Sequence, residues 1–422
     1  MSTASDEGAG KKVVLAYSGG LDTSTVTRWL VERGWEVVCL TVDVGFLDAD
    51  PDLEKRALAA GATRLIVEDA KDMFAHYFVL PALAAGAIYE ERYPLATALA
   101  RPLIAKLLVD VAKAEGAQAV AHGCTGKGND QVRFDVSVAA LAPDLTILAP
   151  VREWELTTRP AEIAYAKEHG IPIRETTESP YSTDENLWGR SIEAGVLEDP
   201  WLEPPGDVYQ WTRSVAEAPD KPEFVEVTFE KGIPVALDGD EIGPVALIER
   251  MHELAGRHGV GRIDMVENRL VGIKSREIYE APAATALREA HLALETLTLS
   301  KPQQRLKRRL AQDYADLIYD GLWFTAHHQD LAAYVRSTQR HVSGVVRLRL
   351  HKGTVTAVGR RSPRSLYQLS LATYDEGDQF DQGAARGFIE LWGLPVRVQA
   401  GSQLLQQPNN PLHIAAGEDK PQ

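Results

Sequence analysis

A short loop of small and polar residues, Ser18–Ser24, constrains the fold more than any other segment. It follows the apolar run Val13–Ala16, which predicts a buried strand, and precedes residues 25–31, which predict a helix. Two glycines in the loop allow the backbone to approach a ligand closely. Unpaired N–H groups at the start of the helix, together with its dipole, favour an anion such as phosphate. The competing interpretation is a solvated turn with a Ser or Thr cap; the flanking strand and helix favour the anion site.

Strand and helix patterns alternate through residues 12–175. The pattern predicts further strands at 37–42, 65–67, 119–121 and 146–149, and helices at 52–60, 102–115 and 160–169. This alternation is typical of an α/β fold with a doubly wound parallel sheet. Ligands bind such sheets beyond the carboxyl ends of the strands. We therefore expect the Ser18 loop and the segment after residue 121 to lie on one rim.

A proline-rich acidic stretch, residues 195–222, predicts a surface connection to a second region. We expect that region to be α+β rather than a continuation of the parallel sheet. Its predicted elements are a strand at 225–229, hairpin turns at Asp238-Gly239 and Lys352-Gly353, and helices at 244–255, 283–299, 302–320 and 328–339. The Gln-, Asn- and Pro-rich end of the chain predicts a loose tail.

Composition limits the classes of function. The 422 residues carry a formal net charge of −15, which argues against a large nucleic-acid footprint. Cys39 and Cys124 are the only cysteines, and their apolar surroundings predict buried, inert thiols in a reducing cytoplasm. No CxxC pair indicates a zinc or redox site. No apolar run reaches the length of a membrane span, and residues 1–11 lack the apolar core of a secretory signal.

A second polar cluster, His122–Phe134, follows the strand expected at 119–121. It is not a Walker phosphate loop, because the spacing of its glycines and lysine is wrong. Asp130 suits an ammonium group, and Arg133 suits a carboxylate because its planar fork donates two parallel hydrogen bonds. The cluster therefore predicts an amino-acid site; from spacing alone, a polar loop that caps the next helix is an equally good interpretation.

Two long motifs together indicate a family. AYSGGLDTS at 16–24 and HGCTGKGNDQVRF at 122–134 resemble the argininosuccinate synthase family, within the N-type ATP pyrophosphatases. Further matches follow in the family's order: ARPLIAK at 100–106, GVLEDPW at 195–201, GVGRIDMVENRLVGIKSREIYEAP at 259–282 and SLYQLSLATYDEGDQFDQGAARGF at 365–388. The resemblance implies an adenine nucleotide alpha hydrolase-like domain followed by an α+β synthetase domain. It also implies a ligase that joins citrulline and aspartate through citrullyl-AMP, in arginine biosynthesis and the urea cycle.

The resemblance also implies site residues. The ATP contacts are Ala16, Tyr17, Ser18, Gly19, Gly20, Leu21, Asp22, Thr23, Ser24, Val42 and Gly123. The aspartate contacts are Thr125, Asn129 and Asp130. The citrulline contacts are Tyr93, Asn129, Arg133, Ser182, Ser191, Glu267 and Tyr279. The catalytic candidates are Asp22, Asn129, Asp130 and Arg133. Of these, the anion-binding character of Ser18–Ser24 and the charge character of Asp130 and Arg133 are also predicted from the residues themselves, whereas Ser182, Ser191, Glu267 and Tyr279 are given by the resemblance alone.

Three positions depart from the family pattern. Val42 stands where a smaller residue, commonly Ala, backs the nucleotide, and Phe46 replaces a common Gln, so both bear on the adenine pocket. Ala98 replaces a Ser that contacts citrulline in many members, which removes one hydrogen bond worth about 1 kcal/mol. We expect Mg²⁺ to enter bound to the phosphates of ATP, with no dedicated protein metal site and with Asp22 as its best side-chain neighbour.

The base that takes the proton from the aspartate amine has no candidate, because a strand-end histidine such as His122 is more often structural. His327-His328 is a weak metal candidate that we interpret as a solvated helix start. The expected domains are a disordered lead-in at 1–11, an ATP-binding domain at 12–178, a synthetase and oligomerisation domain at 179–394 and a flexible tail at 395–422. The resemblance implies a cytoplasmic homotetramer, with contacts from about residue 365 onward.

Two other functions remain open on the sequence. One is a different pyrophosphatase-loop enzyme that adenylylates tRNA; the net charge of −15 and the lack of CxxC pairs count against it. The other is a non-catalytic module that senses ATP through the Ser18 loop. The second region and the amino-acid cluster count against that interpretation. We expect small-molecule substrates, without nucleic acid or membrane as a partner.

Overall fold

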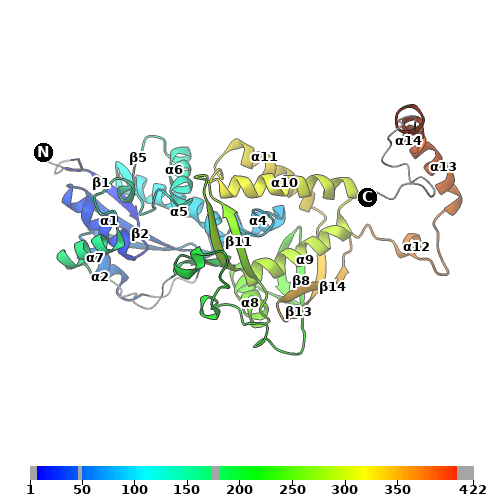
Figure 1. The fold of residues 1–422 in the computed structure, drawn as a ribbon, viewed down its shortest axis with the longest axis horizontal. Helices are drawn as coiled ribbons and strands as arrows, with labels where there is room; N and C mark the ends of the chain where they lie inside the picture. Colours follow the sequence, from blue (N-terminus) through cyan, green and yellow to red (C-terminus); the bar gives the residue numbers. More distant parts are fainter. Residues whose placement is uncertain (1–6, 46–49, 173–180, 406–422) are drawn as a thin grey trace, which may run out of the picture. The chain divides into compact units, whose positions relative to one another are not determined.

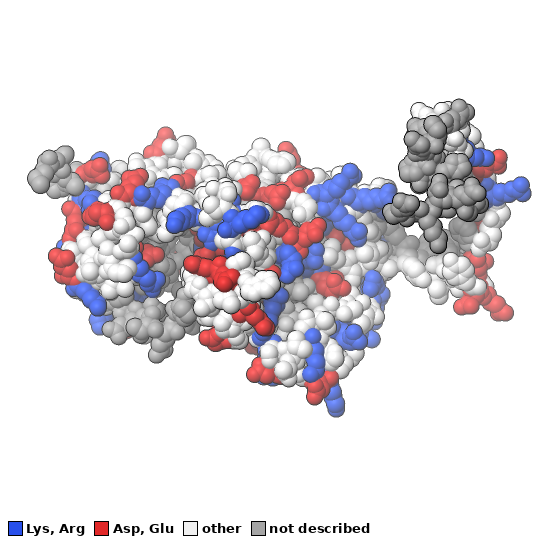
Figure 2. Space-filling model, viewed as in Figure 1, with Lys and Arg blue, Asp and Glu red and all other residues white. Residues whose placement is uncertain are grey.

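The computed structural model describes residues 7–45, 50–172 and 181–405. They belong to two compact units, one up to Leu366 and one from Tyr367 (Figure 1). None of the described helices combines the length and apolar composition that a membrane-spanning helix needs. Acidic and basic side chains are interspersed over the face of the first unit that Figure 2 shows.

The first unit begins with the predicted parallel sheet. Its strands are β1 (Lys12–Ala16), β2 (Glu36–Asp43), β3 (Arg64–Asp69), β4 (Ala119–Ala121) and β5 (Thr146–Leu148). They pair in the order β3-β2-β1-β4-β5, and every pair is parallel. The chain thus adds strands outward from β1 on one side and then resumes on the other side with β4. The strand order reverses between β1 and β4, where a doubly wound sheet opens its ligand crevice.

Helices cover both faces of this sheet, as predicted. They are α1 (Leu21–Glu32), α2 (Leu53–Ala59) and α7 (Arg159–Glu168) on one face, and α5 (Ala96–Glu115) and α6 (Asp130–Leu141) on the other (Figure 1). Each face of the sheet has its own hydrophobic core, and alternate residues of β1 point into one core or the other. Val13 and Leu15 pack with α1, whereas Val14 packs with α5 and α6. Cys39 is a buried free thiol, and its burial raises its pKa to about 12, as expected of an inert residue.

The helix predicted at 102–115 begins earlier, at Ala96, with Pro102 inside it. The predicted range places Pro102 in the first turn of the helix, where its missing N–H costs nothing. The added N-terminal turns bury Ala98 and Leu99 in the main core of the unit. Packing of these residues therefore outweighs the cost of an internal proline.

A second sheet and four long helices confirm the predicted α+β region. The strands are β8 (Glu223–Glu230), β9 (Ile233–Leu237), β10 (Asp240–Glu241), β13 (Gly344–His351) and β14 (Thr354–Arg361), in the order β10-β9-β8-β13-β14. The helices are α8 (Pro244–Arg257), α9 (Pro282–Thr298), α10 (Lys301–Tyr319) and α11 (Ala326–Gln339). Both predicted hairpin turns have positive φ at both central residues, as a two-residue hairpin loop requires.

Some elements were not predicted. One is a buried helical segment made of α3 (Lys71–Phe74), a π-helical turn (Ala75–Val79) and α4 (Leu80–Ala85). The other is a third, antiparallel sheet in the order β11-β12-β7-β6, made of β6 (Ser182–Asn186), β7 (Gly189–Glu193), β11 (Arg262–Asn268) and β12 (Lys274–Glu280). Its strands are rich in charged residues, so they lack the apolar alternation that identifies a strand in a sequence.

The connecting segment at 195–222 is pinned to this third sheet by Glu280, which is fully buried. The Glu280 carboxylate accepts hydrogen bonds from the backbone N–H groups of residues 210–212, from the Thr212 hydroxyl and from Arg190. A buried carboxylate needs such partners to offset its loss of hydration. The connection therefore has a fixed path past the sheet.

The second unit contains α12 (Leu369–Ala372), α13 (Gln382–Trp392), α14 (Leu394–Gln399) and a π-helical turn (Ala400–Leu404). None of its described residues is buried. Its large apolar side chains are exposed, including Phe388, Ile389, Leu391 and Trp392 on α13. The tail expected from residue 395 begins within α14, and residues 406–422 lie outside the described part.

Candidate active site

The Ser18 loop joins β1 to α1 at the point where the strand order reverses. Gly19 has φ +76°, and Gly20 caps α1 in an extended conformation. The backbone N–H and the hydroxyl of Ser18 both contact the Thr23 hydroxyl, at 3.3 and 3.1 Å. The helical hydrogen bonds begin with the Ser24 N–H to the Gly20 carbonyl, so the amides of residues 21–23 precede the ladder. The loop thus has the backbone geometry of an anion site.

Three buried hydroxyl groups, those of Tyr17, Ser24 and Thr41, lie beneath this loop and stabilise it. The Tyr17 hydroxyl lies 3.0 Å from the Ser24 hydroxyl, and the Thr41 hydroxyl donates to the Tyr17 carbonyl at 2.7 Å. Burial raises the pKa of Tyr17. Ser18, in contrast, is exposed. Among the loop hydroxyls, Ser18 is therefore the one open to a ligand, whereas Tyr17 and Ser24 hold the loop in place.

The second cluster meets this loop through Gly123, as expected for strand ends on one rim. A Cβ atom on Gly123 would lie 3.1 Å from Thr23 Cγ2, so the two loops are in contact. Val42 lies near the carboxyl end of β2 and is partly buried. Phe46 lies outside the described residues.

Asp22, on the first turn of α1, is exposed and faces Glu162 of α7. Burial and the neighbouring Asp22 carboxylate raise the pKa of Glu162 to about 8. Glu162 Oε2 is buried without a hydrogen-bond partner in the described part of the chain. Two facing carboxyl groups beside an anion loop are suited to a cation that accompanies the anion. The described residues contain no group of three His, Cys, Asp or Glu side chains arranged for a metal ion.

Arg133 lies in the first turns of α6 and is 3% exposed. Its Nη1 donates to Asp130 Oδ1 at 2.8 Å, and its Nε donates to the Tyr319 carbonyl at 2.9 Å. Its Nη2 is buried and has no partner among the described residues. A buried guanidinium with one unused nitrogen is costly unless a ligand completes it.

Asp130 is held between two guanidinium groups. Arg101, on α5, donates from Nε to Asp130 Oδ2 at 2.8 Å and also bonds Asp184 of β6. Burial opposes the ionisation of Asp130, but Arg101 and Arg133 outweigh it and hold its pKa below the usual value. Asp130 is therefore a carboxylate that suits an ammonium group. Sequence reasoning missed Arg101, although it lies in the quoted motif at 100–106.

The third sheet carries four predicted citrulline residues on one face. Its register places Tyr279, Ser191 and Asp184 in one row across three strands. Because strand side chains alternate, Ser182 and Glu267 lie on the same face as this row. No local pattern predicts these residues, because the strands that carry them lack the apolar alternation by which a strand is recognised in a sequence.

Three predicted residues, Asn129, Arg133 and Glu267, bond Tyr319, which the sequence did not single out. Tyr93 and Tyr279 join the same cluster through Glu267. The Tyr93 and Tyr279 rings stack 4.2 Å apart, and the Tyr279 hydroxyl donates to Glu267 at 2.6 Å. Tyr319 bonds both Glu267 and Asn129. Thr125 and Ser182 are exposed, and in the described residues no hydrogen bond joins their side chains to this cluster.

Ala98 is fully buried behind Tyr93. The Tyr93 hydroxyl accepts hydrogen bonds from the backbone N–H groups of Thr97 and Ala98, at 3.0 and 3.4 Å. The first turn of α5 therefore fixes the Tyr93 side chain from behind.

Both histidine interpretations can be checked. His122 is structural, as expected: its ring bonds Asp135 at 2.8 Å and accepts from the Cys124 N–H. The interpretation of His328 as solvated is wrong, because it is buried against Trp323 and bonds the Tyr314 hydroxyl. Burial lowers the pKa of His328 to about 4.

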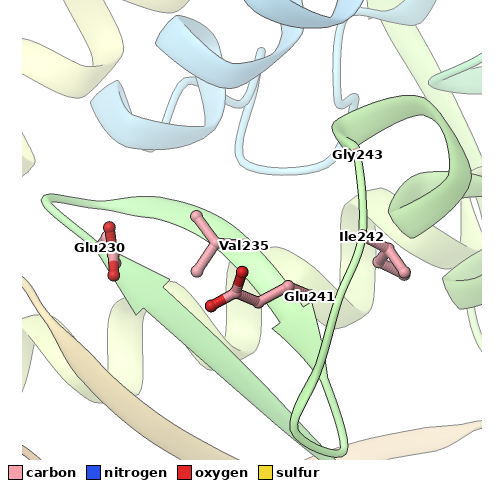
Figure 3. A pocket seen from close by; sticks show the side chains of 5 residues that line it. All are labelled: Glu230, Val235, Glu241, Ile242 and Gly243. Atoms are coloured by element: carbon pink, nitrogen blue, oxygen red, sulfur yellow. The ribbon is translucent and has the colours of Figure 1, made fainter.

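A separate pocket of about 380 Å³ lies beside the β9–β10 hairpin and the start of α8 (Figure 3). It is lined by Glu230, Val235, Glu241, Ile242 and Gly243, none of which is a predicted site residue. Its two ionisable side chains are both acidic, so this pocket is unsuited to phosphate.

Family models and relatives agree on one family. The model described as the arginosuccinate synthase N-terminal HUP domain matches residues 12–172, and the C-terminal domain model matches residues 181–399. The argininosuccinate synthase of Dehalococcoides mccartyi is 57% identical over 394 residues, which cover 93% of this chain and 97% of that protein. The chain belongs to the argininosuccinate synthase family. The argininosuccinate synthase of Rubrobacter xylanophilus is also 57% identical, over 92% of this chain and 95% of its own length.

This match confirms the family that the two motifs predicted. A solved 4-thiouridine synthetase bound to RNA and ATP is 18% identical, over 38% of this chain and 41% of its own, with a TM-score of 0.29. That likeness is too weak to bear on the fold or the function. The HUP domain of the argininosuccinate synthase family coincides with the parallel sheet and its helices.

The two loop glycines should respond differently to substitution. Gly19→Ala should lower the melting temperature, because φ is +76° and the new Cβ would lie 2.4 Å from Leu53 Cδ1. Gly20→Val should leave the melting temperature nearly unchanged, since its conformation suits any residue and a Cβ there meets only the Ser18 hydroxyl, at 3.5 Å.

Gly20→Val should nevertheless weaken ATP binding by tenfold or more, about 1.4 kcal/mol, because the side chain would occupy the space meant for phosphates. Calorimetric titration with ATP and thermal unfolding of both variants check this pair. Near-normal ATP affinity in Gly20→Val would show that the loop does not hold the phosphates.

Proposed function

We propose that this chain joins L-citrulline to L-aspartate at the expense of ATP, through citrullyl-AMP, with release of AMP and pyrophosphate. The observation that carries this proposal is the contact between the Ser18 loop and the amino-acid cluster, through Gly123 and Thr23. An anion loop and a charged amino-acid site on one rim are what adenylylation of an amino acid requires. The product, argininosuccinate, belongs to arginine biosynthesis and the urea cycle.

The chemistry explains why ATP is needed. A ureido carbonyl is a poor electrophile, so its oxygen attacks the α-phosphorus of ATP and pyrophosphate leaves. The aspartate amine then displaces AMP from the activated carbon. The protein contributes positioning and charge stabilisation and forms no covalent bond with the substrates. The amides of residues 21–23 and the Ser18 hydroxyl would hold the pyrophosphate.

The amino-acid assignments follow from charge and free hydrogen-bonding capacity. We assign the unpartnered Nη2 of Arg133 to the citrulline carboxylate, with Tyr93, Ser182, Ser191, Glu267 and Tyr279 around the rest of the molecule. We assign the ionised Asp130 to the aspartate ammonium group, with Thr125 beside it. Asn129, which directly precedes Asp130 at the start of α6, is assigned to both substrates.

Mg²⁺ fits this arrangement as a companion of ATP. Asp22 would be its side-chain neighbour, and the buried unpartnered oxygen of Glu162 adds a second acidic group. When bound, Mg²⁺ would neutralise part of the charge on the phosphates. With two carboxyl groups and no third ligand among the described residues, the phosphates would supply most of its coordination.

Pyrophosphate release from ATP should require citrulline, and formation of the amino-acid product should also require aspartate. A coupled pyrophosphate assay with each substrate omitted in turn checks this order. ADP as the product, or equal turnover without citrulline, would exclude the proposal. Turnover that depends on tRNA would indicate the tRNA-modifying alternative, and ATP binding without any turnover would indicate a sensor.

Arg133→Lys and Thr125→Val should separate the two amino-acid sites. A lysine carries its donors on one nitrogen and lacks the planar fork that directs Nε to Tyr319, Nη1 to Asp130 and Nη2 to a ligand. The citrulline KM should therefore rise by about 5- to 150-fold, or 1–3 kcal/mol. The aspartate KM should change much less. Thr125→Val removes a hydroxyl at nearly constant volume and should act mainly on aspartate. Steady-state kinetics of both variants test the assignment, and an Arg133→Lys effect confined to aspartate would reverse it.

We also propose that the chain acts as a cytoplasmic homotetramer, in which the second unit contributes to the contacts between subunits. The exposed apolar side chains of α13, Phe388, Ile389, Leu391 and Trp392, support self-association. Light scattering at micromolar concentration should give a mass near four times 46.2 kDa. A monodisperse monomer would contradict this expectation.

A further inference from the structure

Tyr319, the last residue of α10, is a candidate beyond the predicted site residues. It is 1% exposed, and its ring stacks on Tyr89 with centroids 3.6 Å apart. Its hydroxyl lies 2.8 Å from Asn129 Nδ2 and 2.7 Å from Glu267 Oε1. Its carbonyl accepts a hydrogen bond from Arg133 Nε. Three residues assigned to citrulline therefore bond this one residue.

We propose that Tyr319 is a positioning residue that fixes Asn129 and Glu267 relative to each other for citrulline binding. This inference rests on the citrulline site proposed above and adds a residue to it. Tyr319 itself is not assigned to any substrate. It acts through the two side chains that its hydroxyl joins.

The direction of each hydrogen bond follows from one backbone group. The Leu270 N–H can only donate, and it bonds Asn129 Oδ1 at 2.9 Å. This fixes the amide orientation, so Asn129 presents its NH₂ group to Tyr319. The Tyr319 hydroxyl must therefore accept from Asn129, which leaves its single proton for Glu267.

Glu267 accepts at both carboxylate oxygens. Oε1 receives the proton of Tyr319, and Oε2 receives that of Tyr279 at 2.6 Å. Burial raises the pKa of Glu267, and the two hydroxyl groups act against this shift because they stabilise the carboxylate. The donor and the acceptor of each hydrogen bond from Asn129 through Tyr319 to Glu267 are therefore defined.

The backbone is also shaped to bring Tyr319 to this place. Gly321, just after α10, has φ +75°, and a Cβ there would lie 2.9 Å from Arg133 Cα. Only glycine allows the end of α10 to approach α6 so closely. The Tyr319 ring also lies 4.8 Å from the guanidinium carbon of Arg133. Asn129 lies at the start of α6 and Glu267 lies on β11. Tyr319, at the end of α10, joins them, and Gly321 allows this end of α10 to pack closely against α6.

Tyr319→Phe tests the inference because it removes only the hydroxyl and keeps the ring. The citrulline KM should rise about tenfold, because the Asn129 amide and the Glu267 carboxylate lose the group that orients both. The ATP KM should stay within twofold, and the aspartate KM should rise less than that of citrulline. Tyr314→Phe is the matched control: it removes another buried hydroxyl of α10, one that bonds His328 at 2.8 Å. That control should leave all three KM values unchanged.

A double-mutant cycle provides the second measurement. Calorimetric citrulline titrations of Tyr319→Phe, Glu267→Gln and the double variant should show that Tyr319→Phe weakens binding less when Glu267 is already changed. Additive effects would overturn the inference. An unfolded Tyr319→Phe variant, or equal rises in all three KM values, would indicate a structural role only and would also overturn it.

The failure of this inference can be distinguished from failure of the proposed function. If pyrophosphate release by the unmodified protein depends on citrulline but Tyr319→Phe keeps a normal citrulline KM, only the inference fails. If citrulline has no effect on the unmodified protein, the proposed function fails as well.

Discussion

The reversal of strand order between β1 and β4 is the constraint on which the site depends. Right-handed connections place the helices that follow these two strands on opposite faces of the sheet. The loops after β1 and β4 therefore separate above the sheet edge and leave a crevice between them. Gly123, after β4, lies against Thr23, after β1, so the two loops meet beside this crevice. The strand order alone therefore brings the Ser18 loop and the cluster at 122–134 together, although they are far apart in the sequence.

The rest of the site is built by hydrogen bonds that join the two regions of the first unit. Asn129 occupies the N-cap position of α6 in the parallel-sheet region, whereas Glu267 and Tyr279 come from the third sheet. Within the described part of the chain, the buried polar side-chain atoms of Asn129, Arg133, Glu267, Tyr279 and Tyr319 all have partners except Arg133 Nη2. Buried groups without partners cost about 1–3 kcal/mol each. Arg133 Nη2 therefore destabilises the unliganded protein, and a ligand carboxylate bound to this nitrogen would remove that destabilisation.

The parts of this structure that follow local rules could be predicted from the sequence. The parallel strands, most helices and both hairpin turns follow apolar periodicity and glycine placement, and all of these appear in the structure. The charge character of Asp130 and Arg133 also follows from residue type. The residues in the third sheet could not be found this way, because polar strands such as Ser182–Asn186 give no periodic signal. The resemblance named Glu267 and Tyr279, but no local signal marks Arg101 or Tyr319.

Arg101 illustrates why such residues escape sequence reasoning. Its role comes from a shared guanidinium that bonds Asp130 of α6 and Asp184 of β6, which lie far apart in the chain. Asp130 lies between two guanidinium groups, so its pKa is lowered. Asp184 is desolvated and faces Asp130, and these effects exceed the opposing effect of Arg101, so its pKa is raised. As the pH falls, Asp184 therefore takes up a proton before Asp130, which the two guanidinium groups keep ionised.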